Sequence, residues 1–382
     1  PGVQLPITKE VYEPILKELE ENGIIFEEFS NGEAIVQAQQ SIVRSGFPIA
    51  AVELSEVETN SDLRGFVING VSVDDLSGFS VSGAGDVNGD GLDDLIVGAK
   101  QDDPNAEDAG ASFVVFGKSG GAVVELSEIE SSTNAGGFVI NGVSPSDFSG
   151  GSVSSAGDVN GDGLADLIIG ARGDDPNGGF SGASFVVFGK TDGTAVELSA
   201  LEGSDNAGGF VINGVSVDNG SVNSAGDVNG DGFDDLALGS PGFDVSNNTS
   251  HDNGKTEIFL GESNGLNNSS WWNQSGSLGD AFGWKIESIS DCDFDGDFEL
   301  AIVSKNWSQT IISGLSNVTN NGKVSIYLGN SSALTLDRNI SQSRNGNLFG
   351  RALASGGDLN GDGFADLVIA NTDSEDDPTG YS

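Results

Sequence analysis

The nine-residue stretch Asp86-Val-Asn-Gly-Asp-Gly-Leu-Asp-Asp94 decides how this chain folds, because near-copies of it recur along the sequence. The later copies begin 72, 69, 64 and 67 residues after one another, at Asp158, Asp227, Asp291 and Asp358. A short apolar run of strand type follows each copy. A motif that repeats at the length of one supersecondary unit indicates that a single structural module was duplicated.

Each copy has the ligand pattern of a calcium-binding loop. The first, third and fifth residues would point side-chain oxygens inward, the seventh would offer its backbone carbonyl, and the ninth would close the shell. Hard oxygen ligands at this density suit Ca²⁺, and Mg²⁺ fits so wide a shell less well. An EF-hand would need Glu at the twelfth position, where this loop has Val97, so that loop type is excluded.

About five calcium sites are therefore predicted, and the ligands are taken position by position from the five loops. The fourth loop departs from the others, since Asp297 stands at the carbonyl position and Glu299 replaces the closing Asp, so its affinity should differ. The alternative for any one loop is an acidic turn without metal, which five copies in register disfavour. The predicted ligands are Asp86, Asn88, Asp90, Leu92, Asp94, Asp158, Asn160, Asp162, Leu164, Asp166, Asp227, Asn229, Asp231, Phe233, Asp235, Asp291, Asp293, Asp295, Asp297, Glu299, Asp358, Asn360, Asp362, Phe364 and Asp366.

The composition narrows the class of protein and of partner. A formal charge of -44 would repel DNA, RNA and anionic lipid, so nucleic-acid binding and membrane insertion are not expected. The single cysteine, Cys292, cannot form an intramolecular disulfide. Calcium would take over the stabilising role of disulfides outside the cell, where its concentration suits modest-affinity sites. We therefore expect an extracellular or cell-surface protein.

Four strands can be assigned to each unit. In the first copy they are Phe79 to Ala84, Leu95 to Gly98, Ala111 to Phe116 and Gly137 to Val143, joined by turns rich in Gly, Asp, Asn and Ser. Four short strands in a unit of about 67 residues match a propeller blade. The predicted fold class is an all-β propeller with five visible repeats and a short α+β segment at the N-terminus.

The domain boundaries follow from where the repeat begins. Residues 1–40 do not match it and read as a helix (Thr8 to Asn22) followed by a hairpin, which would form a cap or linker. Residues 41–382 form the propeller, and N-terminal strands could complete the last blade and close a ring of five. The competing interpretation is a fragment of a larger ring. The blades are placed near 41–76 with 349–382, 77–148, 149–218, 219–280 and 281–348.

Residues around the loop resemble a known family. Phe282-Gly283 and Phe349-Gly350 precede two of the loops, and Gly98-Ala99, Gly170-Ala171 and Gly239-Ser-Pro241 follow three of them. This pattern resembles the FG-GAP repeat, the blade of the integrin alpha-subunit propeller and of many bacterial surface proteins. The resemblance implies calcium in the loops between the first two strands of each blade. Family rings usually have seven blades, which leaves a ring of five in doubt.

Weaker signals have simpler explanations. Arg172-Gly173-Asp174 spells the tripeptide that integrins bind, but it stands where another copy has Lys100-Gln101-Asp102, which favours ordinary drift. Trp271 and Trp272 could stack on a sugar ring or pack between blades. His251 is the only histidine, so no Ser/His/Asp or Cys/His set can be assembled.

These observations predict a binding protein and no enzymatic activity. The expected function is a calcium-stabilised cell-surface propeller that acts as a structural or adhesion module. Its partner would be a protein or a glycan at a cell surface or in a matrix, and self-assembly is compatible with the sequence. The alternative is a lectin-like or enzyme-associated carbohydrate-binding propeller.

Overall fold

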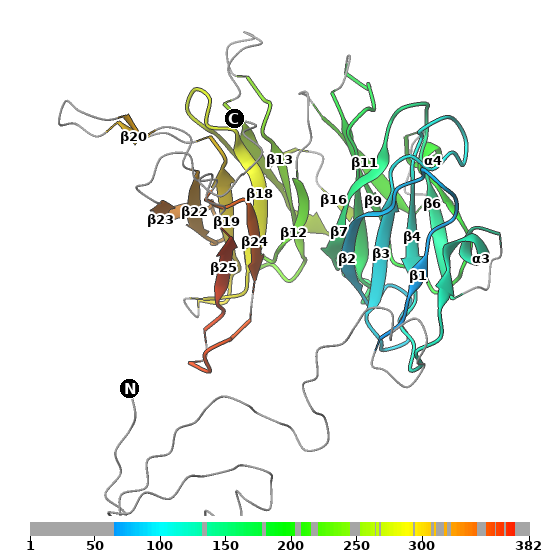
Figure 1. The fold of residues 1–382 in the computed structure, drawn as a ribbon. Helices are drawn as coiled ribbons and strands as arrows, with labels where there is room; N and C mark the ends of the chain where they lie inside the picture. Colours follow the sequence, from blue (N-terminus) through cyan, green and yellow to red (C-terminus); the bar gives the residue numbers. More distant parts are fainter. Residues whose placement is uncertain are drawn as a thin grey trace, which may run out of the picture. The chain divides into compact units, whose positions relative to one another are not determined.

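Short antiparallel strands form nearly all of the secondary structure in the computed structural model (Figure 1). The chain divides into two units, Pro1–Val67 and Ile68–Ser382. All elements given below lie in the second unit. The structure describes residues 65–131, 136–177, 181–202, 208–214, 221–244, 253–263, 265–266, 269–292, 295–306, 309–310, 317–318, 322–341, 349–355, 357–362 and 364–370.

The first repeat forms the four strands predicted for it. They are β2 (Ser77–Gly85), β3 (Asp94–Ala99), β4 (Ala111–Val115) and β6 (Gly137–Asn141). Each pairs with the next in antiparallel register. The strands β3 and β4 are rich in Val, Ile and Phe and almost wholly buried, as expected for interior strands covered on both faces.

The next three repeats each form a four-stranded antiparallel sheet with its strands in chain order, and the last repeat contributes two described strands. The fourth sheet shows that the drifted repeat keeps the blade topology. The strands are β7 (Ser149–Gly157), β8 (Asp166–Ala171), β9 (Ala183–Val187) and β11 (Gly209–Asn213); β12 (Ser221–Gly226), β13 (Asp235–Ser240), β14 (Lys255–Phe259) and β17 (Trp272–Ser275); β18 (Phe282–Ile289), β19 (Glu299–Ser304), β22 (Lys323–Leu328) and β23 (Thr335–Ser341); and β24 (Ala352–Ser355) with β25 (Leu367–Ala370).

Small elements link the sheets. The strand β10 (Val196–Glu197) adds to the edge of β6 in parallel register, and β5 (Val124–Glu125) pairs with β1 (Ile68–Asn69) in the same way. A repeat therefore lends two residues to the outer strand of the repeat before it. The remaining elements are α3 (Leu126–Ser131), α4 (Leu198–Glu202), β15 (Gly261–Glu262), β16 (Gly265–Leu266), β20 (Gln309–Thr310) and β21 (Asn317–Val318).

The first strands of successive repeats pack side by side, in the order β2, β7, β12, β18 and β24. This contact requires glycine in the second strand. A Cβ on Gly98 would lie 2.1 Å from the carbonyl oxygen of Gly150 in the next sheet, and a Cβ on Gly239 would lie 2.1 Å from that of Gly283. The repeated glycine thus permits close approach of one blade's backbone to the next.

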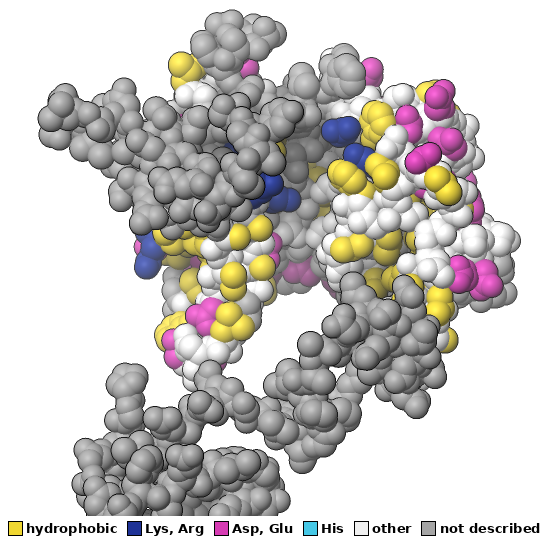
Figure 2. All heavy atoms as spheres, in the orientation of Figure 1, with side chains coloured by type: hydrophobic (Ala, Val, Ile, Leu, Met, Phe, Trp, Pro, Cys, Tyr) yellow, Lys and Arg dark blue, Asp and Glu magenta, His cyan; other side chains and the backbone are white. Residues whose placement is uncertain are grey.

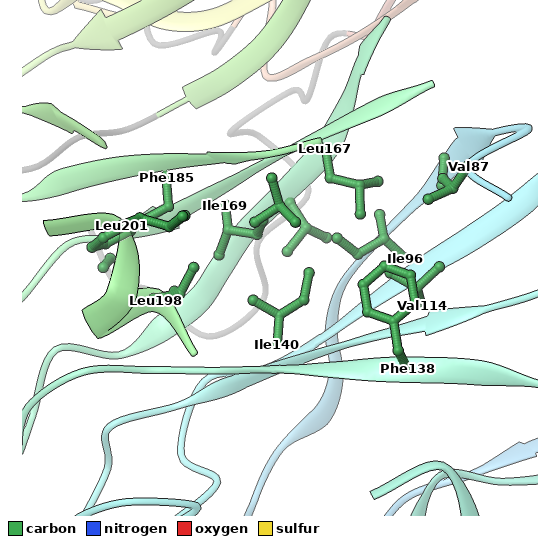
Figure 3. Close-up of a cluster of buried hydrophobic side chains, with 14 of the residues drawn as sticks. Val87, Ile96, Val114, Phe138, Ile140, Leu167, Ile169, Phe185, Leu198 and Leu201 are labelled. Carbon is green, nitrogen blue, oxygen red and sulfur yellow. The ribbon is translucent and has the colours of Figure 1, made fainter. Parts of the chain in front are cut away.

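A buried apolar cluster joins the first two blades (Figure 3). Ile96, Val114 and Phe138 come from the first sheet, and Leu167 and Ile169 come from the second. All five side chains are fully buried. Burial of apolar surface stabilises by roughly 25 cal/mol per Å², so this cluster holds neighbouring blades together.

The structure confirms the predicted fold class, since four-stranded antiparallel sheets in series are propeller blades. The predicted N-terminal helix and hairpin lie outside the described residues, as do 41–64, so closure of the ring stays a prediction. In the described part of the chain, no helix is long and apolar enough to cross a membrane.

Candidate calcium loops

The five acidic loops connect the first strand of each blade to the second. They run from β2 to β3, β7 to β8, β12 to β13, β18 to β19 and β24 to β25. Glycines with positive φ occur within them, such as Gly91 with a φ of 85° and Gly163 with a φ of 89°. Glycine suits these positions because other residues rarely adopt such backbone angles.

The first aspartate of the loop organises the turn. In the first loop the Oδ1 atom of Asp86 accepts hydrogen bonds from the N–H groups of Gly89 (2.8 Å) and Asp90 (3.0 Å). The Oδ2 atom accepts one from Gly91 N–H (2.8 Å). The second and third loops repeat the bonds to the fifth and sixth residues. The loop is therefore wrapped around this carboxylate.

The third and fifth residues continue the same wrapping. The Oδ1 atom of Asn88 accepts a hydrogen bond from Asp90 N–H (2.7 Å), and the Oδ1 atom of Asp90 accepts one from Leu92 N–H (2.9 Å). Equivalent bonds are present at Asn160 and Asp162 and at Asn229 and Asp231. In these three loops, side-chain oxygens at alternate positions thus accept hydrogen bonds from N–H groups of the turn, and their role as metal ligands stays a prediction.

The closing aspartate is the most buried of the acidic residues in the first three loops. Asp94 is 1% exposed, and its Oδ2 and Oδ1 atoms accept hydrogen bonds from Val87 N–H (2.9 Å) and Gly117 N–H (2.7 Å). Burial raises the pKa of Asp166 to about 7 and that of Asp235 to about 8, and the charges of the other loop aspartates add to the rise. A cation would offset this unfavourable accumulation of buried negative charge.

The glycine donors at the third strand were not found from the sequence. Gly117, Gly189 and Gly261 each donate an N–H to the closing aspartate. The signal was available, because a glycine recurs just after the third strand. A Cβ on Gly117 would lie 2.7 Å from the carbonyl oxygen of Asp93, so this close approach also depends on glycine.

The fourth loop keeps the arrangement despite its altered sequence. The Oε2 atom of Glu299 accepts a hydrogen bond from Cys292 N–H (2.6 Å), as the closing aspartate does elsewhere. A Cβ on Gly230 of the third loop would lie 2.3 Å from the Oδ1 atom of Asp297. The Asp297 side chain therefore faces the neighbouring loop, which agrees with a carbonyl role in its own loop. Asp293 lies outside the described residues.

The fifth loop is held more loosely. The Oδ1 atom of Asp358 accepts hydrogen bonds from the N–H groups of Gly361 and Asp362, and Phe364 N–H donates to Asp362. The closing carboxylate of Asp366 accepts hydrogen bonds from the backbone N–H groups of Leu359 and Asn360 and from the side-chain amide of Asn360. Asp366 is only half-buried, whereas its counterparts in the first four loops are buried.

The donor chemistry of the loops fits Ca²⁺. Carboxylates, one amide oxygen and one carbonyl form an all-oxygen set. The Oδ1 atom of Asp291, at the first ligand position, is buried and has no hydrogen-bond partner, and bound metal would satisfy it. Among the described residues, no three Asp, Glu, His or Cys side chains are grouped as a metal centre on their own, because most loop carboxylates turn toward the loop's N–H groups. When bound, the ion would supply positive charge that locks the loop.

Neighbouring loops are linked by backbone hydrogen bonds. The eighth residue of one loop donates its N–H to the carbonyl of the first residue of the loop before it, as Ala165 does to Asp86 (3.0 Å). Asp234 and Phe298 do the same to Asp158 and Asp227. In addition, Asp158 N–H donates to the Oδ2 atom of Asp234 (2.8 Å). Because neighbouring loops are bonded in this way, a change that stabilises one loop also stabilises the packing of the next blade.

Two of the weaker sequence signals have structural explanations. The Oδ2 atom of Asp174 is buried, and the guanidinium carbon of the exposed Arg172 lies 5.1 Å from the Phe148 ring centroid, so both charged side chains have contacts within this chain. Trp271 and Trp272 are half-buried against the core, and the Trp272 ring meets Tyr327 edge-on at 5.2 Å. His251 lies outside the described residues.

The sequence model of the FG-GAP repeat matches residues 77–115, 149–187, 219–263 and 349–382. The drifted fourth blade is outside these matches but retains the same sheet. Integrin alpha-PS5 of Drosophila melanogaster is 33% identical over 184 residues, which cover 47% of this chain and 16% of that protein. Integrin alpha-4 of Xenopus laevis is 32% identical over 161 residues, covering 41% of this chain and 14% of the relative. The similarity thus spans about a sixth of either relative.

Proposed function

Because this chain is an FG-GAP repeat protein homologous to integrin alpha subunits, we propose that it is a calcium-stabilised binding module that engages a protein partner at a cell surface or in a matrix. It would act by binding rather than by catalysis. The observation that carries the proposal is the set of wrapped all-oxygen loops within these repeats. Integrin similarity supports the protein-binding part.

Rigidity is the mechanism that the loop geometry supports. Residues at the first, third, fifth, seventh and ninth positions of each loop would hold calcium. In the first three loops the closing carboxylate is tied both to its own loop and to the glycine after the third strand, as Asp94 is to Val87 and Gly117. The bond from Ala165 to Asp86 extends this connection to the next blade. Metal binding would therefore stabilise blade packing and fix the loops that present a binding surface.

The carbohydrate-binding alternative receives less support from the structure. Its sequence basis was the Trp271–Trp272 pair, which could serve as a stacking platform for sugars. Trp272 instead lies in the outer strand β17 and contacts Tyr327, and both indoles pack against the core. These contacts give both half-buried indoles a packing role, which needs no sugar to explain them.

Peptide display and a glycan array, each with calcium and with chelator, test the proposal. We expect the calcium-loaded chain to select peptides that the chelated chain does not bind. Specific glycan binding without peptide selection would favour the carbohydrate alternative. Failure to bind in both assays would contradict a binding function.

A further inference from the structure

Basic residues recur at one place in the blades of this acidic chain. Lys100, Arg172 and Lys305 each follow the end of the second strand, fourteen residues after the first aspartate of their loop. That end of the strand lies opposite the calcium loops, because the loops precede the second strand. The chain has only 15 Lys and Arg against 59 Asp and Glu, so a repeated basic position is unexpected from composition.

Each of these cations lies over an aromatic ring of its own blade. The Nζ atom of Lys100 is 3.5 Å from the Phe79 ring centroid, and the Nζ atom of Lys305 is 3.4 Å from the Trp284 ring. The Arg172 guanidinium stands over Phe148. Contact with an aromatic face holds a cation in place without neutralising it. Figure 2 shows Lys and Arg side chains, in dark blue, gathered beside hydrophobic side chains near the middle of the view.

Like charges approach one another on this face. Burial, followed by the charge of Arg172, lowers the pKa of Lys100, and burial followed by the charge of Arg351 lowers that of Lys305. In the part of the chain that the structure describes, the ion pairs involve other cations, and none includes these four residues. Cations that repel each other without a carboxylate between them form a ready site for an anion.

A cavity of about 600 Å³ lies between the first strands of the five repeats and borders this face. Phe79, which carries Lys100, forms part of its wall, and Ala352 follows Arg351. Lys285 also lines it and is exposed. In the described residues Lys285 has no ion-pair partner. The cavity thus has an available cation in its wall and further cations beside it.

Among the described residues that line the cavity, the one acidic side chain is already engaged by the protein. The Oε1 atom of Glu287 accepts a hydrogen bond from Ser355 N–H (2.8 Å), and its Oε2 atom lies 3.4 Å from the Asn223 amide nitrogen. Asn223 in turn accepts a hydrogen bond from the Ser154 hydroxyl (2.8 Å). Glu287 therefore belongs to a polar chain across four blades, whereas Lys285 lines the open volume.

We propose that this cavity binds a carboxylate of a protein partner, an acidic side chain or a chain terminus, with Lys285 as the direct contact and Arg351, Lys100, Arg172 and Lys305 as the surrounding positive field. A net charge of -44 repels a long polyanion such as a nucleic acid. A single carboxylate meets only the local field, which favours it over a polyanion. This inference rests on the proposed binding function and names the chemistry of its partner.

Fluorescence anisotropy on the calcium-loaded chain tests the inference at physiological salt. The probe is a fluorescein-labelled peptide of three glutamates separated by glycines, and the matched glutamine peptide is its control. We expect the glutamate peptide alone to bind, and Lys285→Gln to weaken its binding about tenfold through loss of a charge-assisted hydrogen bond. Arg351→Gln should weaken it less, since Arg351 acts through the field.

Arg338→Gln is the matched control for charge removal. Arg338 is exposed on β23 and paired with Asp337, so this variant should bind as the unmodified chain does. Absence of glutamate-peptide binding, equal binding of the glutamine peptide, or equal binding by Lys285→Gln would each overturn the carboxylate site. Peptide display that still yields calcium-dependent binders would in that case leave the binding function standing. If peptide display also yields no binders, both the carboxylate site and the proposed binding function are contradicted.

Discussion

Replacement of Gly98 by alanine should separate the first two blades. Gly98 lies in β3, and a Cβ there would be 2.1 Å from the Gly150 carbonyl oxygen and 2.3 Å from the Ser80 hydroxyl oxygen. The hydroxyl can rotate away, but the carbonyl belongs to the backbone of β7. The same hydroxyl donates a hydrogen bond to that carbonyl (2.8 Å), so the substitution disturbs an existing contact between blades.

The size of the destabilisation follows from the distance by which the two backbones must move apart. Ordinary van der Waals contact begins at 3.4 Å, so the two backbones would have to move apart by more than 1 Å, since 3.4 minus 2.1 is 1.3. Overpacking of this kind costs roughly 1–3 kcal/mol, and the backbone clash places it near the upper end. Loss of the Ser80 hydrogen bond adds about 1 kcal/mol. For a unit that spans Ile68–Ser382, the expected total of roughly 3–4 kcal/mol corresponds to a fall in Tm of about 4–6 °C.

Thermal unfolding followed by circular dichroism in saturating calcium measures this effect. Gly83→Ala is the matched control, because Gly83 lies in exposed β2 backbone and a Cβ there would meet nothing within 4 Å. Its Tm should change by no more than about 2 °C. An unchanged Tm for Gly98→Ala, or an equal fall for both variants, would refute the proposed packing of β3 against β7.

Three further changes have defined outcomes. Burial, followed by the charge of Asp75, raises the pKa of Asp102 to about 6, so the folded state holds more protons than the unfolded state between about pH 4 and 6, and stability falls as pH rises through that window. In denaturant titrations, Asp102→Asn should therefore raise the free energy of unfolding by about 2 kcal/mol at pH 7 and leave it unchanged at pH 4. The exposed Asp103→Asn variant is the control, and equal unfolding curves for the two variants would contradict the prediction. Native mass spectrometry should count one bound calcium ion fewer in Asp235→Asn and an unchanged number in the exposed Asp93→Asn control. An unchanged number in Asp235→Asn would exclude Asp235 as a ligand. Trp272→Ala should cost about 2 kcal/mol through its lost contact with Tyr327 and leave glycan-array signals unaltered, whereas loss of a glycan signal with unchanged stability would revive the sugar platform.

Much of the fold could be predicted because the repeat places the same signals together several times. A polar loop between two apolar runs fixes the first and second strands, and Gly-Phe-Val-Ile-Asn at residues 137–141 marks the fourth. The observed β6 begins at the predicted Gly137 and ends at Asn141, two residues before the predicted Val143, and β4 ends one residue before the predicted Phe116. The two short helices were not predicted, since each spans about one turn and lacks a periodic pattern.

Contacts between repeats were the part that sequence could not supply. The bond from Ala165 N–H to the Asp86 carbonyl joins backbone atoms, so no side chain records it. The five cations around the cavity come from four different repeats, and only the packing of first strands brings Lys285 near Phe79. The pKa of Asp102 likewise depends on burial next to Asp75, which a linear pattern does not show.

Calcium titration against chelator, with thermal unfolding and native mass spectrometry on the same samples, tests the central claim most directly. The account predicts about five bound ions and a sharp fall in Tm on chelation, because each ion would lock a loop that is hydrogen-bonded to its neighbour. Absence of bound ions together with a Tm indifferent to chelator would contradict it and reduce the loops to acidic turns.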